Sequence, residues 1–148
     1  MGDFAIRAYE KTDFEAVVRL WRDCDLLRPW NDPERDIARC RATRDSALFV
    51  GEAGERVTAT VMVGQDGHRG WVYYLGVDPA LRGRGHGTRM MARAETWLTA
   101  RNVPKVQLMV RDDNRTAQDF YRHLGYVTDP VVVMRRWLIE PAVTPPVR

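Results

Sequence analysis

Three glycines alternate with bulky residues in the segment Arg82-Gly83-Arg84-Gly85-His86-Gly87, which lies between a strand pattern and a helical pattern. Glycine adopts backbone angles that other residues avoid and lets a ligand approach the main chain closely. At the start of a helix the first N–H groups are unpaired, and the helix dipole attracts anions to them. The segment therefore predicts a loop that binds phosphate or pyrophosphate, with Arg82 and Arg84 adding charge. An ordinary glycine-rich turn is the alternative.

Two other kinds of nucleotide-binding loop do not fit this segment. A mononucleotide P-loop ends in Gly-Lys-Ser/Thr, whereas Thr88 follows Gly87 here with no lysine between them. The dinucleotide fingerprint opens a parallel βαβ unit with its glycines spread over six residues. The glycines here are spaced differently, and the strands before them form a meander. Both alternatives are therefore excluded.

The chain has 148 residues, 45% of them apolar, which is enough for one domain with its own core. Hydrophobic periodicity, caps and turn signals divide it into strands and helices. The strands are expected at residues 4–8, 47–52, 56–63, 71–77, 103–110, 126–128 and 131–139, and the helices at 13–27, 33–43, 85–101 and 114–124. Short connections make the middle three strands an antiparallel meander. The order predicts an α/β fold.

Several classes of protein are not indicated. No run approaches the ~18 consecutive apolar residues of a membrane span, and the N-terminus lacks a basic region followed by an apolar run, so no signal peptide is expected. Cys24 and Cys40 have no metal-like spacing. We interpret them as free thiols in a reducing cytoplasm, with a disulfide as the alternative, and we expect no metal site.

Arginine dominates the positive charge. Of the 23 basic residues, all but Lys11 and Lys105 are arginine. Arginine suits phosphate recognition because its planar fork of donors matches phosphate oxygens, although a GC-rich coding bias explains the same composition. The arginines are scattered and form no basic run, so nucleic acid is not indicated as a partner.

Two motifs together carry a family resemblance. Leu75-Gly76-Val77-Asp78-Pro79, followed by residues 82–87, resembles the acetyl-CoA signature of the GCN5-related N-acetyltransferase (GNAT) superfamily. Asn114-Arg115-Thr116-Ala117, with Phe120-Tyr121 and Leu124-Gly125-Tyr126, is similar to the late helix and following strand of that family. The resemblance implies a single domain over residues 1–139, with a mixed, mostly antiparallel central sheet flanked by helices. Residues 140–148 are expected to be a proline-rich surface tail.

The resemblance also implies acetyl-CoA as the acetyl-donor cosubstrate. Its pyrophosphate would lie on the amides of residues 83–88 and its pantetheine arm along residues 74–77, where that strand splays from residues 106–110. A backbone N–H near Leu75 would stabilise the oxyanion of a tetrahedral intermediate. Asn114 would bond the arm, and Ala117 would leave room for it. The implied cofactor-binding residues are Leu75, Gly76, Val77, Arg82, Gly83, Arg84, Gly85, His86, Gly87, Thr88, Asn114, Ala117 and Tyr121.

Tyr121 is the implied general acid, because a phenol one hydrogen bond away can protonate the coenzyme A thiolate as it leaves. A core tyrosine is the alternative that the helical spacing also allows. Relatives often carry a glutamate base at the positions held here by Trp71 and Met109, and neither of these side chains can take a proton. Tyr73, expected on the same strand face as Trp71, is the second implied catalytic residue, holding a water or contacting the substrate.

Other groups are candidates for the base and for acceptor binding. Asp25, Asp32 and His68 are possible bases, each with a cap, turn or surface position as its alternative interpretation. The acceptor is expected under the connection between the first two helices. The candidate substrate-binding residues are Arg28, Trp30, Tyr73 and Met109, and for Arg28 and Trp30 the alternatives are a solvated arginine and a packing tryptophan.

These residues predict an acetyl-CoA-dependent N-acetyltransferase that acetylates a primary amine of a small molecule, peptide or protein directly, in a ternary complex. No covalent enzyme intermediate is expected, because neither cysteine lies in the motifs. A non-catalytic acyl-CoA-binding sensor is the alternative that the missing glutamates favour, and an arginine-rich nucleic-acid partner is the third hypothesis. A homodimer through the last strands, common in the family, is a further expectation.

Overall fold

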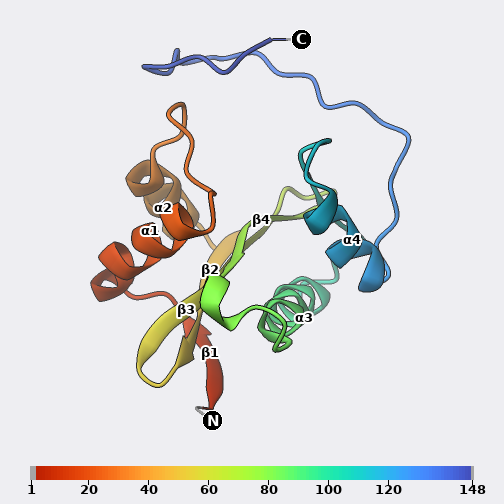
Figure 1. The fold of residues 1–148 in the computed structure, drawn as a ribbon. Coiled ribbons are helices and arrows are strands. Elements are labelled where there is room, and N and C mark those ends of the chain that lie inside the picture. Colours follow the sequence, from red (N-terminus) through yellow and green to blue (C-terminus); the bar gives the residue numbers. More distant parts are fainter. Residues whose placement is uncertain (1–2, 148) are drawn as a thin grey trace.

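A five-stranded sheet forms the centre of the fold in this computed structural model, which describes residues 3–147 (Figure 1). Its strands follow one another in chain order: β1 (Phe4–Ala8), β2 (Ser46–Ala53), β3 (Arg56–Gln65), β4 (Gly70–Val77) and β5 (Val106–Leu108). All neighbours are antiparallel except β4 and β5, which are parallel. The predicted α/β fold with its antiparallel meander is confirmed.

Helices cover both faces of the sheet (Figure 1). On one face α1 (Phe14–Asp23) and α2 (Pro33–Arg41) pack on a core that includes Val17, Trp21, Ile37, Val50 and Met62. On the other, α3 (His86–Thr99) and α4 (Arg115–His123) pack on a second core that includes Val61, Val63, Val72, Met90 and Leu98. Alternate residues of β3 therefore serve different cores, as the period of two in a strand requires.

Both strand pairs of the meander contain a register shift, and the one between β2 and β3 lies at Gly51 and Glu52. β2 and β3 are joined by a tight turn at Ala53–Arg56, as the sequence predicts. Between β3 and β4 the register shifts, because Thr60 pairs with Gly76 while Met62 pairs with Tyr73. Tyr74 and Leu75 thus oppose a single residue of β3, which is the arrangement of a β-bulge. The sequence pattern gave no sign of it.

β4 and β5 stay together for only three residues. The pairs are Gly70 with Val106, Trp71 with Gln107 and Val72 with Leu108. β4 continues to Val77, whereas the strand predicted over residues 103–110 is confined to Val106–Leu108. The two strands therefore diverge beyond Val72, at the place where the resemblance implies a splay.

The helix ends depart slightly from expectation. α2 begins as predicted, with Asp32 accepting bonds from the amides of Glu34 and Arg35 and proline at the first helical position. The predicted extension of α1 to residue 27 is wrong, because the helix ends at Asp23 and Asp25 takes the left-handed φ of 58°. A left-handed residue just past a helix stops its hydrogen-bond pattern.

The two strands predicted at residues 126–128 and 131–139 do not form. After α4 the described chain, to residue 147, has neither strand nor helix and runs away from the sheet and past α1 and α2 (Figure 1). Four consecutive apolar residues, 131–134, provide no alternation to select a buried face. β5 also offers an edge of only three residues. The exposed large apolar side chains of this segment are Val127, Val131, Val132, Val133, Met134, Leu138, Ile139, Val143 and Val147.

A buried carboxylate ties the first strand to the start of α1. Asp13 is 6% exposed and accepts two bonds from Arg7, at 2.7 and 2.8 Å, and a third from the Glu10 amide at 2.8 Å. Arg7 also contacts Glu52 of β2. The bonds from Arg7 are the main reason that the pKa of Asp13 lies below its usual value. Its contribution to stability is therefore present above the unfolded pKa and is lost as pH falls through the lower, folded value.

We predict that Asp13→Asn lowers the free energy of unfolding at pH 7 by about 1–3 kcal/mol, because Arg7 loses one of its two charged acceptors and keeps only Glu52. The deficit should shrink as the pH falls below about 4, where the unfolded carboxyl is protonated. Urea unfolding at several pH values measures both effects. Asp119→Asn is the control, since its ion pair with Arg122 lies on the surface and is worth little. A deficit independent of pH would contradict the assignment.

Candidate functional site

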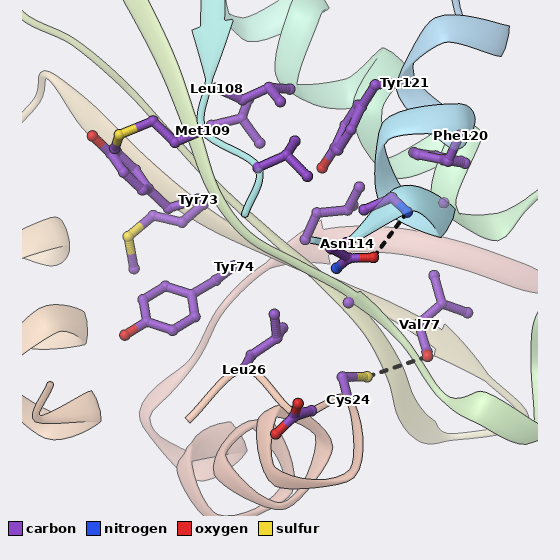
Figure 2. Close-up of a pocket in the computed structure, with 18 of the residues that line it drawn as sticks. Cys24, Leu26, Tyr73, Tyr74, Val77, Leu108, Met109, Asn114, Phe120 and Tyr121 are labelled. Carbon is purple, nitrogen blue, oxygen red and sulfur yellow. Dashed lines mark hydrogen bonds between the residues drawn. The ribbon is translucent and has the colours of Figure 1, made fainter. Parts of the chain in front are cut away.

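A cleft of about 1500 Å³ opens where β4 leaves β5. β4 forms one wall, residues 108–111 and α4 form the opposite wall, and the connection from α1 to α2 closes one side (Figure 2). The glycine loop 82–88 lies at the end of the cleft where α3 begins. The divergence of two strands thus brings together most of the residues that the sequence motifs single out.

The glycine loop has the backbone geometry of an anion site. Gly83 and Gly85 have φ values of 80° and 82°, a conformation that favours glycine, and a Cβ on either would meet nothing within 4 Å. The first intrahelical bond of α3 runs from the Arg89 amide to the Gly85 carbonyl at 3.1 Å. The amides of residues 86–88 therefore precede the helical ladder and can bind an anion.

Three side chains of the loop play different parts. The Nε of Arg82 donates to the Val77 carbonyl at 3.4 Å, and Arg84 is exposed. The His86 ring instead stacks on Phe4 of β1, with centroids 4.0 Å apart. Burial, helped by the charges of Arg89 and Arg84, lowers the pKa of His86 and keeps it neutral. His86 can therefore serve the anion site through its main chain rather than its ring.

Gly76 and Gly87 lie where a larger residue would collide with its neighbours. A Cβ on Gly76 would lie 3.0 Å from Leu26 Cδ1 and 3.2 Å from Cys24 Sγ, and one on Gly87 would lie 3.2 Å from Phe120 Cζ.

The Cys24 thiol donates to the Val77 carbonyl at 3.2 Å, and burial raises the pKa of this thiol. Both cysteines are free, as expected.

Tyr121 projects from α4 into the cleft, and Figure 2 shows its hydroxyl directed toward β4. Its ring makes edge contacts with Phe120 and Tyr126. Burial raises its pKa to about 12, so the phenol keeps its proton at neutral pH. Within the described residues its hydroxyl has no hydrogen-bond partner, which leaves the proton available to a ligand.

Asn114 and Ala117 lie at the start of α4. The Oδ1 of Asn114 accepts a bond from the Ala117 amide at 3.1 Å and caps the helix, which occupies one end of the side-chain amide (Figure 2). Its Nδ2 group still borders the cleft. Asn114 can therefore hold the helix and donate to a ligand at the same time.

The residues predicted to bind the acceptor are only partly gathered in the cleft. Tyr73 and Met109 are 44% and 51% exposed, and both line the cleft. Arg28 lines the cleft, but its Nη1 is bonded to the carbonyls of Asp25 and Leu27, both at 2.8 Å. Trp30 is not part of the lining and lies instead under the guanidinium of Arg111.

The candidate bases are mostly engaged elsewhere. Asp32 caps α2, and His68 lies in the exposed turn before β4. Asp25 borders the cleft, paired with Arg28 at 3.4 Å. Trp71 points away, its Nε1 donating to Asp66 at 3.1 Å. The cleft therefore offers no buried carboxylate at either usual glutamate position.

Sequence reasoning missed Tyr74 and Asp36. Tyr74 O–H donates to Asp36 Oδ2 at 2.6 Å across the acceptor side of the cleft. Burial, followed by this bond and the charge of Asp36, raises the pKa of Tyr74. The one signal in the sequence was the pair of adjacent tyrosines, Tyr73 and Tyr74. In a regular strand adjacent side chains point to opposite faces, yet both of these tyrosines line the cleft.

Two kinds of site are not found in the part of the chain that is described. Residues 3–147 contain no group of three or more acidic, histidine or cysteine side chains placed to hold a metal ion. Over the same residues, no helix combines the length and apolarity needed to cross a membrane.

Comparison with known proteins agrees with this geometry. Residues 5–126 match the family described as the Acetyltransferase (GNAT) family. Proteins named acetyltransferases from Pectobacterium atrosepticum and Yersinia enterocolitica are 48% and 47% identical over 91% and 90% of this chain, covering 96% and 95% of their own. The structure of an aminoglycoside N-acetyltransferase in complex with CoA has a TM-score of 0.80 at 16% identity, covering 94% of this chain and 97% of its own.

Proposed function

Because the chain belongs to the acetyltransferase (GNAT) family, we propose that it uses acetyl-CoA to acetylate a primary amine directly, in a ternary complex. The observation that carries the proposal is one cleft that joins three parts. These are the free amides at the start of α3, the bulged strand β4 and the unbonded hydroxyl of Tyr121. The acceptor is an amine of a small molecule, peptide or protein.

The residues fit the cosubstrate. The amides of residues 86–88 and the guanidinium of Arg84 would hold the diphosphate, since the loop is open and positively charged. The divergent stretch of β4, residues 73–77, would bind the amide-containing arm through its main chain. Nδ2 of Asn114 would donate to that arm, and the small side chain of Ala117 leaves the cleft wide.

When bound, acetyl-CoA supplies an acetyl group activated as a thioester. The amine nitrogen would add to the acetyl carbon, and the carbonyl electron pair would move to the oxygen. The carbonyl would then re-form as the carbon–sulfur bond breaks and the sulfur leaves with that bond's electron pair. The nitrogen would lose a proton as the amide forms, and this proton replaces the one that Tyr121 gives to the sulfur. A backbone N–H at Leu75 would stabilise the negative charge that develops on the acetyl oxygen. Tyr121 would give its proton to the departing sulfur. Burial raises the pKa of this phenol to about 12, so it still carries the proton at neutral pH.

The proton of the amine needs a separate route. An aliphatic amine is mostly ammonium at pH 7 and must lose a proton before it attacks. Trp71 and Met109 cannot accept it. Tyr73, which lines the cleft and is 44% exposed, would hold a water that carries the proton to solvent, and its exposure supports that route.

The first test separates a bound cosubstrate from an empty cleft. We predict that acetyl-CoA at 100 times its Kd stabilises the protein by about 2.7 kcal/mol in thermal unfolding. Gly85→Ala should weaken that binding at least tenfold, because alanine is strained at a φ of 82°. Gly54→Ala, at a φ of 56° in the β2–β3 turn, introduces similar strain away from the cleft and should leave binding unchanged. Absence of any shift with acetyl-CoA would refute the proposal.

The second test concerns catalysis. We predict that Tyr121→Phe lowers kcat 10- to 100-fold with little change in the KM for acetyl-CoA, since the phenol acts on the leaving sulfur. Tyr126→Phe is the matched control, because this ring also contacts Tyr121 but its hydroxyl bonds Glu95. Thiol release over a panel of amines, peptides and aminoglycosides measures turnover. Binding without thiol release from any amine would instead support the sensor alternative.

We also propose that the exposed segment 131–139 pairs with a second copy of the chain. Its apolar residues have no cover of their own, and within the described residues β5 pairs only with β4, so the outer edge of β5 is free to pair. Light scattering should give twice the 17.1-kDa chain mass. The double variant Met134→Asp, Leu138→Asp should give the single mass, and a wild-type protein of single mass would exclude the pairing.

A further inference from the structure

Tyr74 has a φ of 53° in the middle of β4, which is unusual for a residue with a side chain. Such a conformation costs on the order of 1–3 kcal/mol and persists only where the surroundings hold it. It coincides with the bulge in which Tyr74 and Leu75 oppose Val61. The contacts around Tyr74 should therefore reveal what maintains this shape.

A buried hydroxyl holds the main chain of Tyr74. Thr60 Oγ1 donates to the Tyr74 carbonyl at 2.8 Å and accepts a bond from Trp21 Nε1 at 2.9 Å. Thr60 and Trp21 are both completely buried. The Thr60 hydroxyl thus has one donor and one acceptor partner, and its direction is fixed.

The side chain of Tyr74 is held as well. Its ring stacks on Trp21 with centroids 3.8 Å apart and an interplanar angle of 7°. Its hydroxyl donates to Asp36 of α2. Trp21 therefore contacts the bulge twice, through its ring and through Thr60, and connects α1 to the strand that lines the cleft.

The carbonyl of Tyr74 and the N–H of Leu75 belong to one peptide unit. Among the described residues no peptide bond is cis, so these two groups point to opposite sides of the chain. Thr60 lies on β3 and holds the carbonyl on that side of β4. The Leu75 N–H consequently points away from β3, toward the side where β4 separates from β5 and the cleft opens.

We propose that Thr60 and Trp21 are positioning residues that aim the Leu75 N–H into the cleft by holding the Tyr74 carbonyl. The inference rests on the proposed acetyl transfer, in which this N–H stabilises the acetyl oxygen. It adds that the direction of the Leu75 N–H is set by two buried side chains that do not line the cleft. Neither touches substrate, and each acts through the peptide between Tyr74 and Leu75.

Thr60→Val tests this positioning role, because valine keeps the shape of threonine but lacks the hydroxyl that holds the Tyr74 carbonyl. Loss of an oxyanion donor costs about 10²–10³ in kcat, and a misaimed donor should cost part of that. We expect a 10- to 100-fold fall in kcat and a KM for acetyl-CoA within threefold of wild type. Thr60→Ser retains the hydroxyl and should restore kcat to within threefold.

Thr58→Val is the matched control. Thr58 lies two residues earlier on β3 and is also fully buried, but its hydroxyl faces the Gly51 carbonyl at 3.5 Å and has no contact with the bulge. It removes the same atoms from the same strand. A kcat for Thr60→Val equal to that of Thr58→Val, with both proteins folded, would overturn the inference.

A measurement on the free protein separates this inference from the proposed function. The residual dipolar coupling of the Leu75 N–H reports its direction by NMR without any ligand or turnover. It should change in Thr60→Val and in Trp21→Phe, which removes the indole donor, and stay constant in Thr58→Val and Thr60→Ser. If the coupling is unchanged in both Thr60→Val and Trp21→Phe, these two residues do not position the Leu75 N–H. A changed coupling in a protein that never binds acetyl-CoA would refute the function alone.

Discussion

The pairing of β4 with its two neighbours is the constraint on which the rest of the structure depends. β4 pairs with β3 along its length, with one bulge, but with β5 only as far as Val72. The unpaired stretch beyond provides main-chain groups that nothing in the sheet uses. Both walls of this cleft pack on the core beneath α3 and α4, through Val72 and Val77 of β4 and Leu108 of β5.

The two faces of the sheet contribute different parts of the site. The face covered by α3 and α4 supplies the anion loop and Tyr121, both of which local sequence encodes. The face covered by α1 and α2 supplies the contacts that shape β4 itself, through Trp21 and Thr60. Residues on opposite sides of β4 therefore shape the same cleft.

How far the sequence predicts this protein depends on the range of the interactions involved. The glycine loop and the cap at Asp32 were predictable because each requirement is met within a few residues. The bulge at Tyr74 depends on Trp21 and Thr60, distant in sequence, and no periodicity signals it. The last two strands were predicted from apolar content alone, and the segment lies apart from the sheet because that content does not specify a partner strand.

The glycine loop 82–88 and the start of α3 also contact the first strand, β1. Phe4 of β1 stacks on His86, and its carbonyl accepts a bond from Arg89 at 2.9 Å, one turn into α3. Two residues of the loop-to-helix junction therefore depend on where the first strand lies. A fusion partner that displaces Phe4 would therefore also displace the start of α3, because both contacts join the first strand to that helix.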